Sequence, residues 1–107
     1  MDLSTKKCVP CEGGILPLNE TEISEYKKQI SESWIVIENN KLSKEFFFVS
    51  YRHTIDFVIK VASIAEEEGH HPVLHIYFGR AVVDLWTHSI SGLSENDFIL
   101  AAKIDKI

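Results

Sequence analysis

Two short segments carry most of the histidine in this chain. The first is Glu66-Glu67-Glu68-Gly69-His70-His71-Pro72 and the second is Trp86-Thr87-His88, and three of the five histidines fall within them. Histidine has an unperturbed pKa close to neutrality, so it can give or take a proton at cellular pH. Two adjacent histidines before a proline, with a third downstream, predict an acid–base site.

The expected backbone conformation gives these histidines different positions and therefore different roles. Adjacent side chains of an extended segment point to opposite sides, so His70 and His71 should not do the same job. His88 is expected to end a strand that pairs, through a short hairpin, with the strand leaving Pro72, and it should therefore lie close to the His70-His71 pair. The alternative is that these are loop histidines with satisfied hydrogen bonds and no chemistry, because clustered histidines mark functional sites only statistically.

Two acidic residues stand at informative distances from the histidines. Asp97 lies in the first turn of an expected helix, where an acid meets the helix dipole favourably and completes a cap. It is also placed to orient a histidine. Glu66, one helical turn before His70, has the same two interpretations, whereas Glu67 and Glu68 are expected to be solvated.

A zinc site and a redox site compete with the acid–base interpretation. A zinc site would gather His70, His71, His75 and His88, with Cys8-Val9-Pro10-Cys11 as a half-site, but no second half-motif appears at the usual spacing. A redox-active pair should open a helix, whereas Glu12-Gly13-Gly14 follow Cys11. We therefore expect two reduced thiols in a flexible arm and no bound metal.

The elements that must position these residues can be read from the hydrophobic pattern. Residues 1–18 show no periodicity and predict an irregular arm, and residues 19–107 predict a single domain. Within it we expect a helix over 20–32, strands over 33–38 and 42–50, a helix capped by Thr54 and ended by Gly69, strands over 73–78 and 81–88 around a Gly79-Arg80 loop, and a last helix capped by Ser94. The expected order is α-β-β-α-β-β-α. Trp34 and Phe46-Phe47-Phe48 are expected in the core, although one of these rings could line the pocket of a flat ligand.

Composition narrows the classes of partner. The chain has 107 residues, 45% hydrophobic and 25% charged, which is the balance of one globular domain. Its net charge of −5 argues against nucleic acid, because phosphate binding needs a basic face. No apolar run approaches the roughly 20 residues that span a bilayer, and the first residues lack the apolar region of a secretory signal. We expect a cytoplasmic protein that contacts no membrane.

With these residues in view, the sequence resembles the pterin-4a-carbinolamine dehydratase family, in its bacterial form. The resemblance covers roughly residues 20–105. The residues that carry it, besides Trp34 and Ala65, are Glu66, His70, His71, Pro72, Phe78, His88 and Asp97, together with the run from Thr87-His88 through Gly92-Leu93-Ser94 to Asp97. The spacing from His-His-Pro to Thr-His makes the resemblance specific, beyond what a single short motif gives.

The resemblance implies a fold, an activity and partners. The family fold is α+β, with a four-stranded antiparallel sheet and helices packed on one face, assembled as a homodimer or homotetramer through sheet edges. Members dehydrate 4a-hydroxytetrahydrobiopterin, or a related pterin carbinolamine, to the quinonoid dihydropterin, and so recycle the cofactor of aromatic amino-acid hydroxylases. The pterin is the substrate, and no metal or redox cofactor is implied.

The chemistry suggests roles for individual residues. Expelling the 4a-hydroxyl group requires a proton on the departing oxygen, and forming the C=N bond requires loss of the N5 proton. We expect His70 and His88 to carry these proton transfers, His71 to bind and position the pterin, and Asp97 to orient a histidine. Residues expected to bind substrate beside His71 are Glu66, Phe78 and Trp34. Val73-Leu74-His75 lacks the aromatic residues of animal members, so the wall facing the pterin should differ.

A second class of function stays open. Some relatives keep the fold without turnover, as binding or assembly proteins linked to molybdenum-cofactor metabolism, and animal members also act as dimerisation cofactors of a homeodomain transcription factor. A neighbouring gene for an aromatic amino-acid hydroxylase would favour the recycling enzyme.

Overall fold

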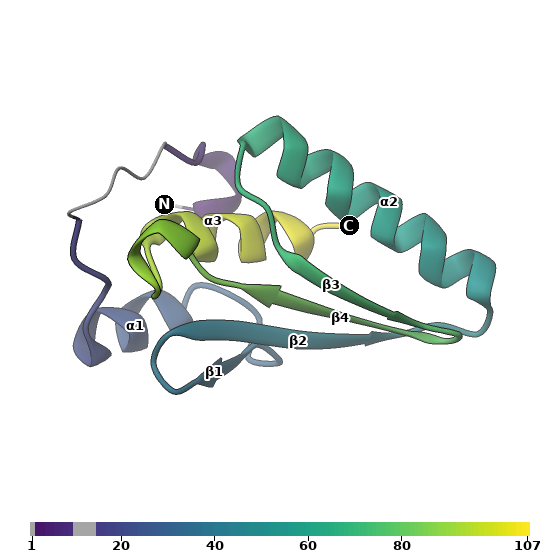
Figure 1. Cartoon of the computed structure of the whole chain (residues 1–107), viewed down its shortest axis with the longest axis horizontal. Coiled ribbons are helices and arrows are strands. Elements are labelled where there is room, and N and C mark those ends of the chain that lie inside the picture. The colour runs from purple at the N-terminus through teal and green to yellow at the C-terminus, as the bar shows by residue number, and fades with distance from the viewer. Residues whose placement is uncertain (1, 10–14) are drawn as a thin grey trace.

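The computed structural model describes residues 2–9 and 15–107 and confirms an α+β fold with the expected order of helices and strands (Figure 1). The elements are α1 (Glu20–Lys27), β1 (Ile35–Ile37), β2 (Lys41–Phe47), α2 (Tyr51–Glu68), β3 (Val73–Tyr77), β4 (Arg80–Leu85) and α3 (Glu95–Ile104), with two short 3₁₀ helices, η1 (Leu3–Thr5) and η2 (His88–Ile90). Several elements are shorter than predicted. The first helix ends at Lys27, and the first strand has three residues.

The four strands form one antiparallel sheet in the order β1-β2-β4-β3. The helices α2 and α3 lie on the same side of this sheet (Figure 1). Because side chains alternate along a strand, one face of the central pair β2 and β4 supplies Leu42, Val83 and Leu85 to the buried core beneath the helices. Side chains such as Ile35 and Phe47 lie on the opposite face and are exposed.

The start of α2 differs from the prediction. Ser50, and not Thr54, caps the helix, because its side chain accepts a hydrogen bond from the backbone N–H of His53. Thr54 lies one turn inside the helix and is completely buried. Its hydroxyl group lies 2.9 Å from the carbonyl oxygen of Phe78 and 3.0 Å from that of Ser50. Thr54 therefore connects α2 by a hydrogen bond to the turn between β3 and β4.

The end of α2 agrees with the prediction and sets up the first histidine. Gly69 has φ +67° and ends the helix in the left-handed conformation that glycine adopts without strain. The N–H of His70 then reaches back to the carbonyl oxygen of Ala65, at 3.2 Å. This reversal turns the chain away from α2 and directs the His70 side chain towards the start of α3.

The hairpin that leads to the third histidine is also shifted. Its two-residue loop is Phe78-Gly79, and not Gly79-Arg80, because Tyr77 pairs with Arg80. A side chain at Gly79 would stand 2.8 Å from the carbonyl oxygen of Phe48, so the close approach of this backbone requires glycine. The strand β4 ends at Leu85, so the prediction that His88 ends the strand was wrong. His88 instead begins η2.

The predicted irregular arm holds some structure. Leu3 is buried within η1, which packs against α3. Cys11 and its neighbours 10–14 lie outside the described residues. Among the helices of the described part of the chain, none is both long enough and apolar enough to cross a membrane.

Candidate active site

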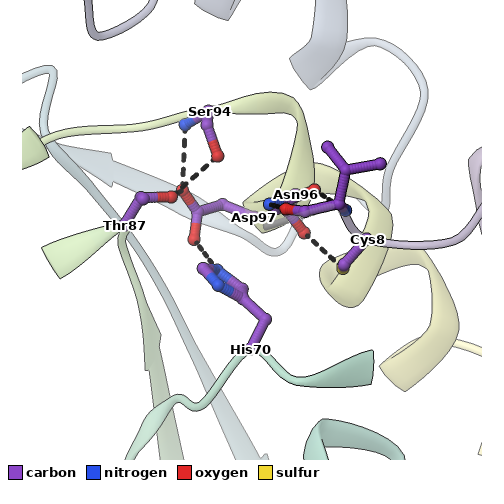
Figure 2. A network of polar contacts seen from close by, with 7 residues as sticks. Cys8, His70, Thr87, Ser94, Asn96 and Asp97 are labelled. Carbon is purple, nitrogen blue, oxygen red and sulfur yellow. Dashed lines mark hydrogen bonds and ion pairs between the residues drawn. The ribbon is translucent and has the colours of Figure 1, made fainter. Parts of the chain in front are cut away.

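A short hydrogen bond between His70 and Asp97 forms the centre of the site. The Nε2 atom of His70 lies 2.6 Å from Oδ1 of Asp97, and the two side chains are 12% and 0% exposed (Figure 2). His70 follows the glycine that ends α2, and Asp97 occupies the first turn of α3. The end of one helix and the start of another therefore bring these two groups together.

The other contacts of Asp97 also bring hydrogen-bond donors to its carboxylate. Its other oxygen, Oδ2, accepts a hydrogen bond from the Thr87 hydroxyl at 2.8 Å and from the Ser94 N–H at 3.0 Å (Figure 2). An acidic side chain at the start of a helix interacts favourably with the helix dipole. A carboxylate only accepts hydrogen bonds, so this network assigns the shared proton to Nε2 of His70. Asp97 thus caps its helix and also contacts His70, and its role in orienting that histidine stays a prediction.

His88 shares a hollow with His70. The hollow has a volume of about 260 Å³ and is lined by Gly69, His70, His71, Trp86, Thr87, His88 and Ser89. The imidazole of His88 stacks on the indole of Trp86, with 4.3 Å between ring centroids and 25° between the planes. His88 is exposed. The site therefore presents one partly buried imidazole, held by Asp97, and one exposed imidazole to the same small space.

His71 also lines the hollow, whereas Glu66 is not among the lining residues and contacts His71 from outside it. His71 Nε2 is 2.8 Å from Glu66 Oε1, and both side chains are mostly exposed, at 62% and 81%. His70 is therefore turned inward and His71 outward, which agrees with the alternation expected for adjacent extended residues. In this position His71 can contact a ligand from the rim, with Glu66 beside it.

Two aromatic residues proposed as substrate contacts lie elsewhere. Trp34 is 1% exposed, and its indole N–H donates to the carboxylate of Asp105 at 3.0 Å. Phe78 is exposed in the turn of the β3–β4 hairpin, where its ring stacks with that of Tyr51 at 6.4 Å. The structure brings neither residue to the hollow, and the role of each in substrate binding stays a prediction.

Sequence reasoning assigned no role to Trp86 or Thr87 and placed Glu68 in solvent. Trp86 and Thr87 precede His88 directly, which was the available signal. The side chain of Glu68 is 5% exposed and lies 3.5 Å from the ammonium group of Lys103, so the expectation that it is solvated was wrong. Burial alone would raise the pKa of Glu68, but the hydrogen bond from the Cys8 N–H and the charge of Lys103 outweigh it and lower the pKa.

The histidines considered for a zinc site do not all gather. His75 lies on the open face of the sheet, 2.9 Å from Asp84, whose carboxylate also accepts a hydrogen bond from the Ser43 hydroxyl at 2.6 Å. Within residues 2–9 and 15–107, no group of three or more His, Cys, Asp or Glu side chains is arranged to hold a metal ion.

Cys8 is expected to be an unreactive thiol. Burial, and then the neighbouring Glu68 carboxylate, raise its pKa from 9.0 to about 12. Since the thiolate is the nucleophile, a Cys11→Ser variant should be alkylated at pH 8.5 roughly 10³-fold more slowly when folded than in denaturant. The raised pKa also means that the thiol form stabilises the fold below pH 9, and that this stability is lost as the pH rises towards 12. Equal alkylation rates in the two states would contradict this description of Cys8.

Fold and site together describe an α+β protein with a carboxylate-anchored histidine and a second histidine facing one small hollow. Residues 16–107 match the family model described as "Pterin 4 alpha carbinolamine dehydratase". The chain therefore belongs to the pterin 4 alpha carbinolamine dehydratase family.

Bacterial relatives span nearly the whole chain. The protein is 50% identical over 103 residues to a Rickettsia bellii (strain OSU 85-389) protein, covering 96% of this chain and 91% of the relative. It is 42% identical over 105 residues to one from Alkaliphilus metalliredigens, covering 98% and 95%. Both relatives carry the name "Putative pterin-4-alpha-carbinolamine dehydratase".

Two solved structures resemble the fold. The crystal structure of a "transcriptional coactivator/pterin dehydratase" from Brucella melitensis superposes with a TM-score of 0.77 at 27% identity, covering 84% of this chain and 96% of that one. A "pterin dehydratase-like protein" described as a RuBisCO assembly factor of the alpha-carboxysome superposes with a TM-score of 0.59 at 28% identity, covering 69% and 87%. The family fold therefore occurs in proteins described as dehydratases and in one described as an assembly factor.

Proposed function

We propose that this protein dehydrates a pterin-4a-carbinolamine, such as 4a-hydroxytetrahydrobiopterin, to the quinonoid dihydropterin by histidine acid–base catalysis. The observation that carries the proposal is the 2.6 Å bond from His70 to a buried Asp97, beside a hollow that His88 shares. Membership of the family supports the substrate class.

The reaction needs two proton transfers and no change of oxidation state. One proton moves to the 4a-hydroxyl oxygen, which leaves as water, and the N5 proton is removed as the C=N bond forms. His70 has Nε2 committed to Asp97, so its Nδ1 atom is the one that exchanges a proton with the pterin. His88 exchanges the other proton, and His71 binds the ring from the rim. In this proposal no metal or redox cofactor takes part.

The proposal is tested by following the dehydration of 4a-hydroxytetrahydropterin, generated in situ, with and without the purified protein. We expect the protein to accelerate the reaction well beyond the buffer-catalysed rate. An unaccelerated reaction would refute the enzymatic function. We further propose that this dehydration is one step in recycling the pterin cofactor of an aromatic amino-acid hydroxylase in the cytoplasm, with a separate reductase supplying the two electrons that restore the tetrahydropterin. A gene for such a hydroxylase beside this one would support that role.

We also propose that the protein is a homodimer or homotetramer joined through a sheet edge. The exposed apolar residue Ile76 lies on the edge strand β3, and this strand contains neither proline nor Lys, Arg, Asp or Glu. Such an edge is a template for pairing with another strand.

The variant Ile76→Lys should shift the protein to monomers in sedimentation velocity, because a charge at an edge strand opposes pairing. Ile37→Lys places the same charge on the opposite edge strand, β1, and should leave the assembly intact. A monomeric wild-type protein, or assembly that survives Ile76→Lys, would contradict the proposal.

An assembly protein without turnover is the second candidate. The observation that favours it is an exposed apolar group made of Tyr51 and Ile59, which line one shallow hollow along α2, and Phe78, whose ring stacks with that of Tyr51. Exposed apolar groups of this kind mark interaction surfaces. A protein partner that co-purifies with this chain, in the absence of pterin turnover, would favour this function over the enzyme.

A further inference from the structure

The N-terminal segment 6–9, called the strap here, lies against both helices that carry the His70–Asp97 pair. Its residues Cys8 and Val9 contact one side chain from the end of α2 and one from the start of α3. The strap has no role in the proposed chemistry and contributes no residue to the lining of the hollow.

Val9 is bound through its backbone by Asn96. The Val9 N–H donates to Oδ1 of Asn96 at 3.0 Å, and the Asn96 amide donates to the Val9 carbonyl oxygen at 2.6 Å. Asn96 is 4% exposed, whereas Val9 is 65% exposed, so the contact depends on the Val9 backbone and not on its side chain. Asn96 directly precedes Asp97, and this pair of hydrogen bonds therefore fixes the first turn of α3 (Figure 2).

Cys8 is bound in the same way to the other helix. Its N–H donates to Oε1 of Glu68 at 2.8 Å, and Glu68 is the last residue of α2. The lowered pKa of Glu68 keeps this acceptor ionised, which strengthens the hydrogen bond. His70 follows Glu68 by two residues, so the contact fixes the helix end from which His70 departs.

From these contacts we propose that the strap is a positioning device, and that Asn96 and Glu68 are positioning residues, for the His70–Asp97 pair. Two consecutive residues of the strap bridge the two carriers of a 2.6 Å hydrogen bond. A displacement of about 1 Å between catalytic groups can cost roughly 10²-fold in rate. By joining the end of α2 to the start of α3, the strap holds Asp97 at the distance that orients His70. This inference rests on the proposed function only for its kinetic consequence.

The experiment uses the full chain and substitutions that separate backbone from side chain. Val9→Pro removes the N–H that Asn96 accepts, whereas Val9→Ala keeps it and serves as the matched control. Asn96→Ala removes both hydrogen bonds to Val9. Lys106→Met, which breaks the contact of the arm with Asp2 at the far end of α3, controls for a loosened arm.

Two readouts are compared well below the melting temperature of each variant. The first is the proton resonance of His70 Nε2–H, which a short hydrogen bond to a carboxylate moves downfield. We expect Asn96→Ala and Val9→Pro to shift it upfield or to lose it by exchange with water. The second is dehydration, in which kcat should fall about tenfold while KM changes less than threefold, because binding from the rim is untouched.

An unchanged His70 resonance in both folded variants would overturn the proposal. Effects from the controls Val9→Ala and Lys106→Met as large as those from Val9→Pro and Asn96→Ala would also overturn it. The resonance is measured without substrate. If the wild-type protein shows no dehydration, the proposed function fails while the positioning role is still decided by the spectrum.

Discussion

Alanine in place of His70 is expected to slow dehydration by about 10²–10⁴-fold, the range that a positioned acid or base contributes. The substitution removes the imidazole that Asp97 orients, and the buried carboxylate keeps its hydrogen bonds from Thr87 and Ser94. The fold should therefore survive, with about 1–3 kcal/mol of stability lost for the missing partner of a buried group. The measurement is kcat on the purified variant, with its thermal melt recorded in parallel.

Matched substitutions separate this effect from the general loss of a histidine. His88→Ala should also lose most of the rate, because His88 supplies the second proton transfer. His53→Ala should keep full activity, since His53 lies at the start of α2 and bonds Ser50 outside the hollow. Full activity in both His70→Ala and His88→Ala would remove the basis for histidine catalysis.

The largest expected loss of stability follows from Trp34. Trp34→Ala should lower the free energy of unfolding by about 3–5 kcal/mol, because it empties a fully packed aromatic site. The indole packs edge-on against Phe46 at 6.3 Å, and its N–H shares the carboxylate of Asp105 with the ammonium group of Lys44. Urea denaturation measures this loss, and a cost under 1 kcal/mol would contradict the packing described here.

The conservative variant Trp34→Phe decides whether Trp34 also binds substrate. It keeps an aromatic ring in the core but removes the N–H and part of the buried volume, so it should cost less stability than Trp34→Ala, and most of the protein should stay folded at assay temperature. If Trp34 is structural alone, KM for the pterin should remain within twofold of the wild-type value. A large increase in KM, with stability little changed, would restore the role in binding that the sequence predicted for this residue.

Local signals in the sequence placed Asp97 and His70 at helix ends but did not say which histidine Asp97 contacts. Gly69 indicated where α2 ends, just before His70, and the capping pattern of Ser94 and Asp97 indicated where α3 begins. Both signals are common at helix ends. The cap of α2 was misplaced because Ser50 and Thr54 are equally suited to cap a helix by chemistry. Only the tertiary contact of Thr54 with the Phe78 carbonyl decides between them.

The remaining features of the site depend on contacts that residue types do not encode. The strap is held in part through the backbone N–H groups of Cys8 and Val9, and any residue other than proline offers the same N–H group. Glu68 is indistinguishable from Glu67 in a run of three glutamates until the helix face towards Lys103 is known. Trp86 stacks on His88, and this contact depends on the turn at η2, where the sequence predicted a continuing strand.

The pairing of β2 with β4 has a consequence for the way the chain becomes active. Leu42 pairs with Leu85, so all of α2 and β3 lie inside the loop that this pairing closes. Closing a long loop costs chain entropy before its contacts repay it, which slows folding. His70 lies inside that loop, whereas His88 and Asp97 lie beyond it. The two parts of the site become neighbours only when the central strands have met, so catalytic competence should appear together with the native sheet and not in any partly folded chain.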